Sequence, residues 1–377
     1  MSGRSLFSLT GVFVFVLFSV LLLSFTGCEE KYGHNDNEEE EEQTVVPDED
    51  AGDAVHDADR EEERDEAGDE AGDDDYEEIS EEEPGIVDED ETPDEEPEIP
   101  EEEKIKSVTI GTYNTRLFFD KVCDTGTCSS SDFEKVPSDP EYSEKVSDLA
   151  ASVREIGADI ILVQEVEKDS CLKDLFEKAG GYDEYYLGEK GYSASVDTGV
   201  MTKGKITYKN KHIEQIDCAG CDCGKTTFSR AFLETHISLG GRDIIVFSAH
   251  FKSKADDDAE RRLAEAAAAA KIMKSVAEKY PGALIVMGGD LNDEPGSDTL
   301  EPFESDPAFL RVADELSSRD QATYSYRGEA IAIDHIFWMK SGAGSYRQGS
   351  AEVVKDAPSW YSLGSSDHAA LKAVFEF

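Results

Sequence analysis

The chain has 377 residues, of which 86 are Asp or Glu and 36 are Lys or Arg, so its formal net charge is −50. This charge excludes tight, unaided binding to nucleic acid, which requires cations that neutralise the phosphates. Most of the charge lies in residues 29–103, where 40 acidic and 3 basic side chains give a net charge of −37. Residues 104–377 hold 46 acidic and 32 basic side chains, and this segment is long enough to bury one sizeable core.

The chain begins with the pattern of a bacterial secretion signal. Arg4 precedes an apolar run over residues 12–25, and small residues lead into Cys28. The run is shorter than the roughly 20 apolar residues that a membrane span needs. We expect residues 1–27 to be a signal peptide of the lipoprotein type, with Cys28 lipidated and anchored to a membrane. A plainly cleaved signal or a short anchor is the alternative. The protein would then be an exported lipoprotein at the cell surface, the outer membrane or a periplasmic face.

The segment 28–103 is expected to be a disordered acidic linker. It has almost no apolar side chains to bury, so it cannot offset the entropy lost on ordering. Like-charge repulsion extends such a chain. A spacer that holds a domain away from a membrane is the favoured interpretation, and calcium capture or a surface-export cue is the alternative.

Strands and helices are expected to alternate along residues 104–377. Apolar or alternating runs predict strands over residues 107–114, 159–166, 198–201, 228–237, 244–250, 283–288, 332–338 and 369–377. Helical spacing predicts helices over residues 143–156 and 260–279, and residues 120–140 are expected to be a loop. This pattern indicates a layered α/β domain.

Besides Cys28, the chain has six cysteines. They are Cys123, Cys128, Cys171, Cys218, Cys221 and Cys223. An even number in an exported chain suggests disulfides, and Cys123 and Cys128 could close a small loop. The Cys-x-x-Cys spacing leaves a zinc site as the alternative. The connectivity cannot be read from the sequence.

Polar residues collect where the predicted strands end. They are Asn114, Gln164, Glu165, His250, Asp290, Asn292 and Asp334, followed by Ser366, Asp367 and His368 before the last strand. Carboxylate and amide oxygens suit Mg²⁺ or Mn²⁺, and histidines suit proton transfer near neutral pH. Hydrolysis of a phosphoester needs a hard cation, an activated water and stabilisation of the phosphoryl charge. The set of side chains fits that chemistry.

Six motifs that contain these residues occur in the order found in one hydrolase superfamily. They are TYN at 112–114, LVQEVE at 162–167, SAHFKSK at 248–254, GGDLND at 288–293, IDHIF at 333–337 and SDH at 366–368. Residues 104–377 thus resemble the endonuclease/exonuclease/phosphatase superfamily, whose fold is that of pancreatic-type deoxyribonuclease. HFKSK followed by Arg261-Arg262, and Thr323-Tyr324-Ser325-Tyr326 before IDHIF, are most similar to secreted bacterial nucleases. The resemblance implies a four-layer α/β/β/α sandwich of two mixed sheets flanked by helices.

The resemblance also implies a role for each residue of the set. Metal ligands would be Asn114, Glu165 and Asp367; catalytic residues would be His250, Asp290, Asn292, Asp334 and His368; Arg230 would contact the substrate phosphate. Asp290 and Asn292 would orient the attacking water and the phosphate. Asp334 would be the carboxylate partner of His368. Mg²⁺ would be the cofactor, with Mn²⁺ or Ca²⁺ as alternatives.

Some positions depart from the family pattern or stay open. IDHIF has His335 where Tyr is common, and we expect His335 to be structural. No carboxylate partner for His250 is evident, and Asp197 is a weak choice. A basic run, consisting of Lys203, Lys205, Lys209, Lys211 and His212, is expected to be a solvated hairpin face. The alternative is a patch that helps an acidic domain hold a polyanion.

The sequence therefore predicts a metal-dependent phosphodiesterase, favoured as an extracellular or surface-anchored endonuclease acting on DNA or RNA. A lipid or small-molecule phosphoesterase, of the sphingomyelinase or inositol-phosphate phosphatase type, is the first alternative. No aromatic-rich hairpin that would insert into a bilayer is evident from the sequence. A non-catalytic surface binding module is the second alternative. We expect a monomer without an obligate protein partner.

Overall fold

A computed structural model describes residues 104–377 apart from residues 130 and 257. The predicted signal peptide over residues 1–27, the lipid anchor at Cys28 and the predicted acidic linker over residues 28–103 lie outside the described residues.

Two mixed sheets form the centre of the described domain. The first has the order β15 (Ser345–Tyr346), β17 (Ala370–Glu376), β1 (Ser107–Phe118), β2 (Ile160–Val166), β4 (Asp197–Thr202) and β3 (Glu184–Leu187), with β16 (Glu352–Val354) also paired to β17. The second has the order β11 (Phe309–Arg311), β14 (Asp334–Met339), β10 (Leu284–Asp290), β9 (Arg242–His250), β8 (Phe232–Leu239) and β5 (Lys205–His212). Each sheet has one parallel pair, β1 with β2 and β9 with β10, and the other pairs are antiparallel.

Two small ribbons and four helices complete the described part of the domain. The ribbons pair β12 (Tyr324–Tyr326) with β13 (Glu329–Ile331) and β6 (Gln215–Asp217) with β7 (Lys225–Thr227). The helices are α1 (Asp139–Ile156), α2 (Asp169–Ala179), α3 (Ala259–Lys279) and α4 (Glu301–Glu304). Short 3₁₀ turns cover Asp222–Gly224, Lys254–Asp256 and Val312–Glu315.

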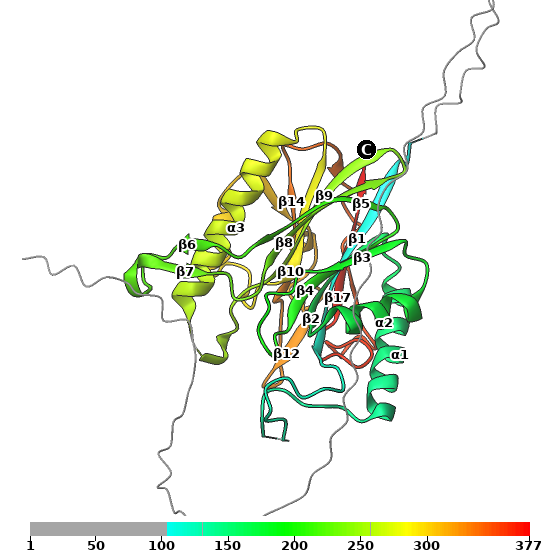
Figure 1. The fold of residues 1–377 in the computed structure, drawn as a ribbon. Helices are drawn as coiled ribbons and strands as arrows, with labels where there is room; N and C mark the ends of the chain where they lie inside the picture. Colours follow the sequence, from blue (N-terminus) through cyan, green and yellow to red (C-terminus); the bar gives the residue numbers. More distant parts are fainter. Residues whose placement is uncertain (1–103, 130, 257) are drawn as a thin grey trace, which may run out of the picture. The chain divides into compact units, whose positions relative to one another are not determined.

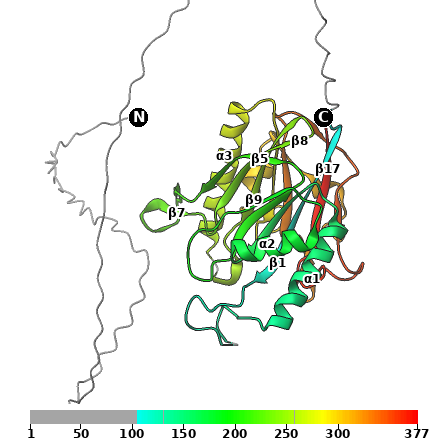
Figure 2. The same cartoon turned by 45° about the vertical axis from the view of Figure 1, so that its right-hand side comes forward.

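The sheets pack face to face between layers of helix, so the predicted four-layer α/β/β/α sandwich is confirmed. Ile110, Val246 and other apolar side chains fill the space between the sheets. The outer face of the first sheet packs against α1 and α2 through residues such as Leu149 and Leu172. The outer face of the second packs against α3 and α4 through residues such as Met273. Figures 1 and 2 show α1 and α2 on the opposite side of the molecule from α3.

The register of the strands brings the predicted site residues to one end of the sandwich. Asp290 at the end of β10 pairs with His250 at the end of β9 and with Asp334 at the start of β14. In the other sheet, Asn114 in β1 pairs with Gln164 in β2. Because parallel strands end at the same edge of a sheet, their terminal polar residues converge without any long loop to position them.

The helix predicted over residues 143–156 begins four residues earlier, at Asp139. Pro140 occupies the first turn, where its missing N–H costs nothing. The backbone N–H of Ser138 donates to the Glu141 carboxylate at 2.8 Å, which satisfies a donor at the helix start. The helix ends at Gly157, whose φ of +64° suits glycine. The helix predicted over residues 260–279 is confirmed as α3.

Disulfides join Cys123 to Cys128 and Cys218 to Cys221. The prediction that Cys171 is part of a disulfide is wrong, because Cys171 is a buried free thiol on α2. Its side chain packs in the core between α2 and the first sheet, where it acts as a small apolar residue. Among the described helices, none is long and apolar enough to span a membrane.

Candidate active site

The centre of the candidate site joins the two sheets through three side chains. The Asn114 Nδ2 atom donates to Glu165 Oε1 at 3.1 Å and to Asp290 Oδ2 at 3.0 Å. Asn114 and Asp290 are buried, and Glu165 is half-buried. One amide thus holds a carboxylate from each sheet toward a common point. A half-turn of the amide would present its oxygen there, which is the atom that a cation requires.

The backbone around this centre is held in uncommon conformations. Glu165 has a φ of +64° and Asn292 a φ of +54°, and Arg116 and Leu117 also have positive φ. Such conformations cost about 1–3 kcal/mol each and persist where the surroundings fix them. The surroundings do so here: Leu117 N donates to Glu165 Oε2 at 2.7 Å, and Asn292 N donates to Asp290 Oδ1 at 2.9 Å.

His250 lies beside both carboxylates. Its Nε2 is 3.9 Å from Glu165 Oε1 and 3.8 Å from Asp290 Oδ2. Burial, followed by the charges of Arg230 and His368, lowers the pKa of His250 well below its ordinary value. The neutral ring therefore offers a lone pair, which suits a proton acceptor or a metal ligand.

His368 has the opposite charge state. Its Nδ1 lies 2.8 Å from Asp334 Oδ2, and its Nε2 lies 3.9 Å from Asp290 Oδ2. Burial lowers the pKa of His368, but the Asp334 charge and hydrogen bond, and then the Asp290 charge, outweigh burial and raise the pKa to about 10. The ring is thus a cation at neutral pH. The predicted pair of Asp334 and His368 is present.

Asp290 connects the two histidines. Burial and then the Asp334 charge raise the pKa of Asp290, whereas the His368 charge acts in the opposite direction. Asn292 completes this end of β10, because its Nδ2 donates to Phe251 O at 3.1 Å. A carboxylate and an amide are thereby fixed side by side, as the sequence predicted for this pair.

The donor atoms fit a hard divalent cation. Ligand atoms of Glu165, His250 and Asp290 lie within 4.8 Å of one another, and so do those of Asp290, Asp334 and His368. Oxygen-rich sets of this kind suit Mg²⁺ or Mn²⁺, and a neutral imidazole is compatible with Mn²⁺. Glu165 and Asp290, with Asn114 between them, are the residues placed to hold it.

Asp367 and Arg230 lie at the margin of the cluster. Asp367 is paired with Arg116 at 3.4 Å, so its carboxylate is engaged by a cation near the end of β1. Arg230 Nε donates to Val196 O at 3.3 Å, and its charge contributes to the lowered pKa of His250. Both remain within electrostatic range of the centre, and neither makes a hydrogen bond to it among the described residues.

The suggested pairing of Asp197 with His250 is wrong. His250 Nδ1 is buried without a hydrogen-bond partner among the described residues, and Asp197 Oδ1 is in the same situation. The other oxygen of Asp197 accepts from the Ser195 hydroxyl at 2.5 Å. Asp197 is buried, and the charge of Arg230 acts on both Asp197 and His250.

His335 and the basic run have local partners. His335 is fully buried and its Nε2 lies 2.9 Å from Asp293 O, as expected for a structural histidine. In the basic run, Lys203 pairs with Asp159 at 3.0 Å, and Lys211 donates to Glu189 O at 2.6 Å. These contacts favour the interpretation of a solvated hairpin face over that of a polyanion patch.

Two residues beside the site, Lys145 and Tyr324, had no predicted role. The Lys145 ammonium on α1 donates to Thr115 O at 2.7 Å and to Ser365 O at 2.9 Å. Thr115 directly follows Asn114, and Ser365 directly precedes the SDH segment. Burial, and then the charge of Arg116, lowers the pKa of Lys145 to about 8. The Tyr324 ring lies 4.8 Å from the His368 ring. A sequence signal existed for Lys145, because it falls on the apolar stripe of its helix, three residues after the buried Tyr142.

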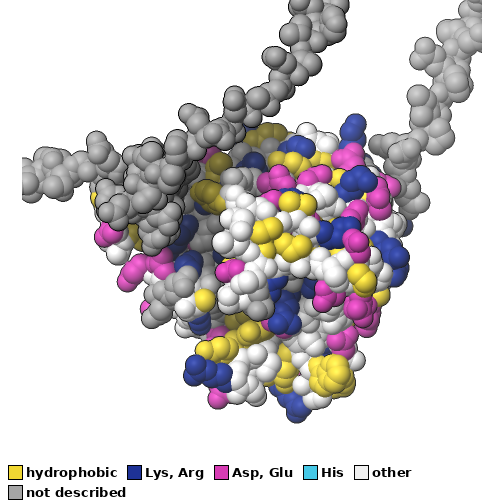
Figure 3. All heavy atoms as spheres, turned by 60° about the horizontal axis from the view of Figure 1, so that its bottom comes forward, with side chains coloured by type: hydrophobic (Ala, Val, Ile, Leu, Met, Phe, Trp, Pro, Cys, Tyr) yellow, Lys and Arg dark blue, Asp and Glu magenta, His cyan; other side chains and the backbone are white. Residues whose placement is uncertain are grey.

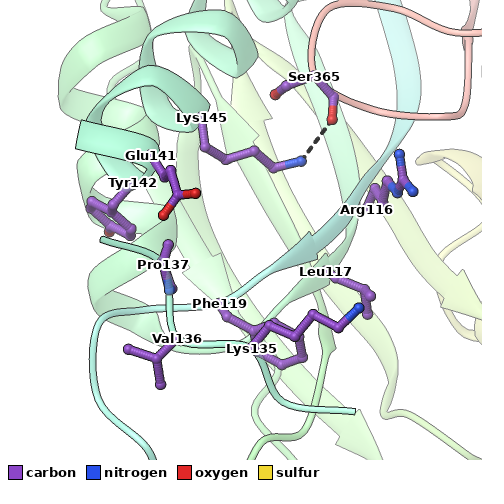
Figure 4. Close-up of a pocket in the computed structure, with 10 residues that line it drawn as sticks. All are labelled: Arg116, Leu117, Phe119, Lys135, Val136, Pro137, Glu141, Tyr142, Lys145 and Ser365. Atoms are coloured by element: carbon purple, nitrogen blue, oxygen red, sulfur yellow. Dashed lines mark hydrogen bonds between the residues drawn. The ribbon is translucent and has the colours of Figure 1, made fainter. Parts of the chain in front are cut away.

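A cleft of about 550 Å³ adjoins the centre (Figure 4). Its apolar lining includes Leu117, Phe119 and Val136, and its cationic lining consists of Arg116, Lys135 and Lys145. Ser365, which precedes the SDH segment, forms part of the wall. The cleft thus lies between the end of β1 and the start of α1, and Leu117, whose backbone N–H donates to Glu165 Oε2, connects it to the centre.

The fold occurs in known structures. TDP2 from C. elegans has 16% identity and a TM-score of 0.51, over 72% of this chain and 75% of that one. The human Nocturnin catalytic domain has 16% identity and a TM-score of 0.51, over 73% and 96%. An endonuclease/exonuclease/phosphatase family protein from Bacteroides thetaiotaomicron has 17% identity and a TM-score of 0.51, over 72% and 98%. At these identities, the likeness shows a shared fold. No curated protein matches the sequence.

Family membership follows from the sequence itself. The model of the Endonuclease/Exonuclease/phosphatase family matches residues 109–359, which is more than half of the chain and includes the ends of β1, β2, β9 and β10. With the sandwich and the convergent strand ends described above, this match shows that the chain belongs to the endonuclease/exonuclease/phosphatase family.

Proposed function

We propose that this protein is a divalent-metal-dependent phosphodiesterase whose substrate is DNA or RNA. The observation that carries the proposal is the pair of histidines in opposite charge states, 3.8 and 3.9 Å from the same carboxylate of Asp290. A binding module has no need for a buried neutral base beside a buried cation. A hydrolase that moves a proton and stabilises phosphoryl charge needs both.

The proposed role of each residue follows from its charge. The positively charged His368 can stabilise the phosphoryl oxygens, and Asp334 keeps it charged and oriented. The neutral His250 can accept a proton, and Asp290 with Asn292 can orient the attacking water. A cation held by Glu165 and Asp290 would polarise the phosphate and favour deprotonation of water. We propose Mg²⁺ as that cation, with Mn²⁺ or Ca²⁺ as alternatives.

The surroundings support a polyanionic substrate despite the acidic composition. The cleft beside the centre has Arg116 and Lys135 in its lining, and apolar walls on which an unstacked base could rest. Figure 3, viewed from the end of the molecule that carries the loop after β1, shows Lys and Arg side chains interspersed with acidic and apolar ones. Cations are therefore spread over this face among acidic side chains, and Arg116, Lys135 and Lys145 are those that line the cleft.

The test is cleavage of supercoiled plasmid and of single-stranded RNA by the purified protein, with Mg²⁺, Mn²⁺, Ca²⁺ or a chelator. We expect metal-dependent cleavage that falls by about 10²- to 10⁴-fold in His368→Ala, because a general acid–base or charge-stabilising group contributes on that scale. Asp290→Asn should lose activity to a similar extent because it removes a carboxylate shared by the metal and histidine positions.

Asp243→Asn, an exposed change near the start of β9 and at the opposite end of that strand from His250, is the matched control and should retain activity. Equal cleavage by wild type and both site variants would contradict the proposal. Cleavage that persists in chelator would contradict the metal requirement.

A lipid phosphodiester is the second candidate, and one observation favours it. Val122, Phe133 and Val136 are exposed by 38–57% and belong to the same loop beside the cleft. Exposed apolar side chains on one loop are able to contact a bilayer surface. Release of phosphocholine from sphingomyelin vesicles, with no cleavage of nucleic acid, would favour this candidate. Silence with both substrates in folded protein would favour the non-catalytic binding module.

Export as a lipoprotein anchored through Cys28 belongs to the same proposal. It is supported by the signal-like sequence and by the two disulfides, because disulfides persist in oxidising compartments. A surface-anchored enzyme of this kind would act on nucleic acid outside the cell.

A further inference from the structure

We infer that the loop between β1 and α1, together with Glu167 directly after β2, forms a second cation site, separate from the catalytic centre, whose natural ligand is Ca²⁺. The site consists of Asp120, Asp124, Glu134 and Glu167, which we call the carboxylate cluster. An oxygen atom from each of Asp124, Glu134 and Glu167 lies within 4.8 Å of the other two. None of these residues has a role in the proposed hydrolysis.

Two of the four carboxylates are deeply buried. Glu134 is 2% exposed and Glu167 is 3% exposed. Removing a carboxylate from water costs several kcal/mol unless partners compensate for the lost hydration. The hydrogen-bond and ion-pair partners of each oxygen therefore decide whether the carboxylate cluster needs a further cation.

Both oxygens of the Glu134 carboxylate have hydrogen-bond donors within the loop. Its Oε1 accepts from Asp124 N at 2.6 Å, and its Oε2 accepts from Thr125 N at 2.9 Å and from the Thr125 hydroxyl at 2.6 Å. Glu134 thus serves as the anchor of the turn that the Cys123–Cys128 disulfide closes.

Only one of the two oxygens of the Glu167 carboxylate has a hydrogen-bond donor. Its Oε2 accepts from Asp120 N at 2.6 Å, whereas its Oε1 is buried without a hydrogen-bond partner among the described residues. A buried carboxylate oxygen without a donor is rare in folded proteins and calls for a partner. A cation bound among the neighbouring carboxylate oxygens would be such a partner.

Lys168 neutralises only part of the negative charge of the carboxylate cluster. Its ammonium pairs with Asp120 Oδ2 at 2.9 Å and with Asp124 Oδ2 at 2.7 Å. One lysine facing four carboxylates leaves a net charge of −3 in a space a few ångströms wide. No bond from Lys168 reaches the unpaired oxygen of Glu167 among the described residues. A divalent cation between Glu167, Glu134 and Asp124 would satisfy that oxygen and reduce the repulsion.

The chemistry of the cluster selects Ca²⁺. Every donor is oxygen, the donors come from an irregular loop that can adjust, and Asp124 is partly exposed so that water can complete the coordination. Mg²⁺ demands a stricter octahedral geometry. Bound Ca²⁺ would fix the loop that continues into Lys135 and Val136, two residues that line the cleft.

The test is hydrogen–deuterium exchange of the full chain, read by mass spectrometry on peptides from residues 119–137. Peptide resolution separates this site from Ca²⁺ bound elsewhere, including the acidic segment. For a dissociation constant of about 10⁻⁴ to 10⁻³ M, typical of extracellular calcium modules, about 10 mM Ca²⁺ should slow exchange in these peptides roughly ten- to hundredfold. The effect should be absent in Glu167→Gln, which keeps the acceptor for Asp120 N.

Asp124→Asn is the second variant, chosen because this side chain is partly exposed and lies outside the core, and it should reduce the response in the same way. Glu165→Gln removes a ligand of the proposed catalytic metal and should keep the response in residues 119–137. Glu177→Gln, an exposed change on α2, is the matched control. An undiminished response in both cluster variants, loss of the response in Glu165→Gln, or no response in wild type would each overturn the inference. An equal response to Mg²⁺ would overturn the choice of Ca²⁺.

Discussion

At the scale of single residues, the charge of His368 depends on Asp334. The pKa of His368 is raised to about 10, above the value of about 6.5 for an unfolded histidine. The charged ring therefore contributes stability that is fully present below about pH 6.5 and is lost as the pH rises through about 10. In Asp334→Asn the main opposing charge disappears while burial continues to disfavour the cation.

We expect the pKa of His368 in Asp334→Asn to fall from about 10 toward its ordinary value of about 6.5. NMR titration of the ring, with and without the substitution, measures this directly. Asp243→Asn serves as the control and should leave the titration of His368 as it is in wild type. A His368 titration in Asp334→Asn that matches wild type would show that Asp334 does not hold the charge.

At the scale of elements, the two central strands of the second sheet approach very closely at Gly289. A Cβ atom at this position would lie 1.9 Å from Ala249 O on β9, which is a backbone atom that cannot move aside. We expect Gly289→Ala to destabilise the protein by about 1–3 kcal/mol or more, because overpacking forces the backbone to shift. Because β9 and β10 carry His250 and Asp290, the same shift should also reduce activity.

Gly282→Ala is the matched control for this prediction. A Cβ atom at Gly282 meets no atom within 4 Å, and the residue precedes the same strand. Urea-induced unfolding of both variants measures the difference in the free energy of unfolding. Equal stabilities would show that β10 can move away from β9 more easily than the packing indicates.

Helices and strands were predicted correctly where a single segment has a clear hydrophobic pattern. The strand at residues 283–288 is a continuous apolar run because β10 is buried on both faces, and its end at Asp290 was therefore recognisable. β5 (Lys205–His212) was not predicted, because it is an edge strand with several charged residues and no apolar run. Helix α2 was also missed, because its apolar residues are few and separated by charges.

The residues of the candidate site likewise fall into those that a sequence motif could identify and those that only the folded structure could. Asn114, Glu165 and His250 could be identified because each follows an apolar or alternating run within a motif, although β1 itself continues beyond Asn114 to Phe118. The carboxylate cluster and the bonds of Lys145 could not be identified, because they depend on segments brought together only by folding. Glu134 and Glu167 are far apart in sequence, and no local pattern places their oxygens side by side.

At the scale of the whole molecule, the chain combines an acidic segment with a family domain in which disulfides join Cys123 to Cys128 and Cys218 to Cys221. Export and acylation would explain both features. We expect the mature protein to sediment with membranes and to have an acyl group on Cys28, measured by fractionation and by the mass of the N-terminal peptide. Cys28→Ser should move it to the soluble fraction. A wild-type N-terminal peptide without an acyl group would contradict the lipid anchor.

The site is closed by contacts between the two ends of the domain. The Ser366 hydroxyl donates to Asn114 O at 2.7 Å across a sequence separation of 252 residues, and the Tyr113 hydroxyl donates to Leu363 O at 2.6 Å. The first strand therefore cannot complete the catalytic geometry until the last strand has been synthesised and has paired beside it. In the exported nuclease that we propose, activity would therefore begin only after the whole domain has been translated and has folded.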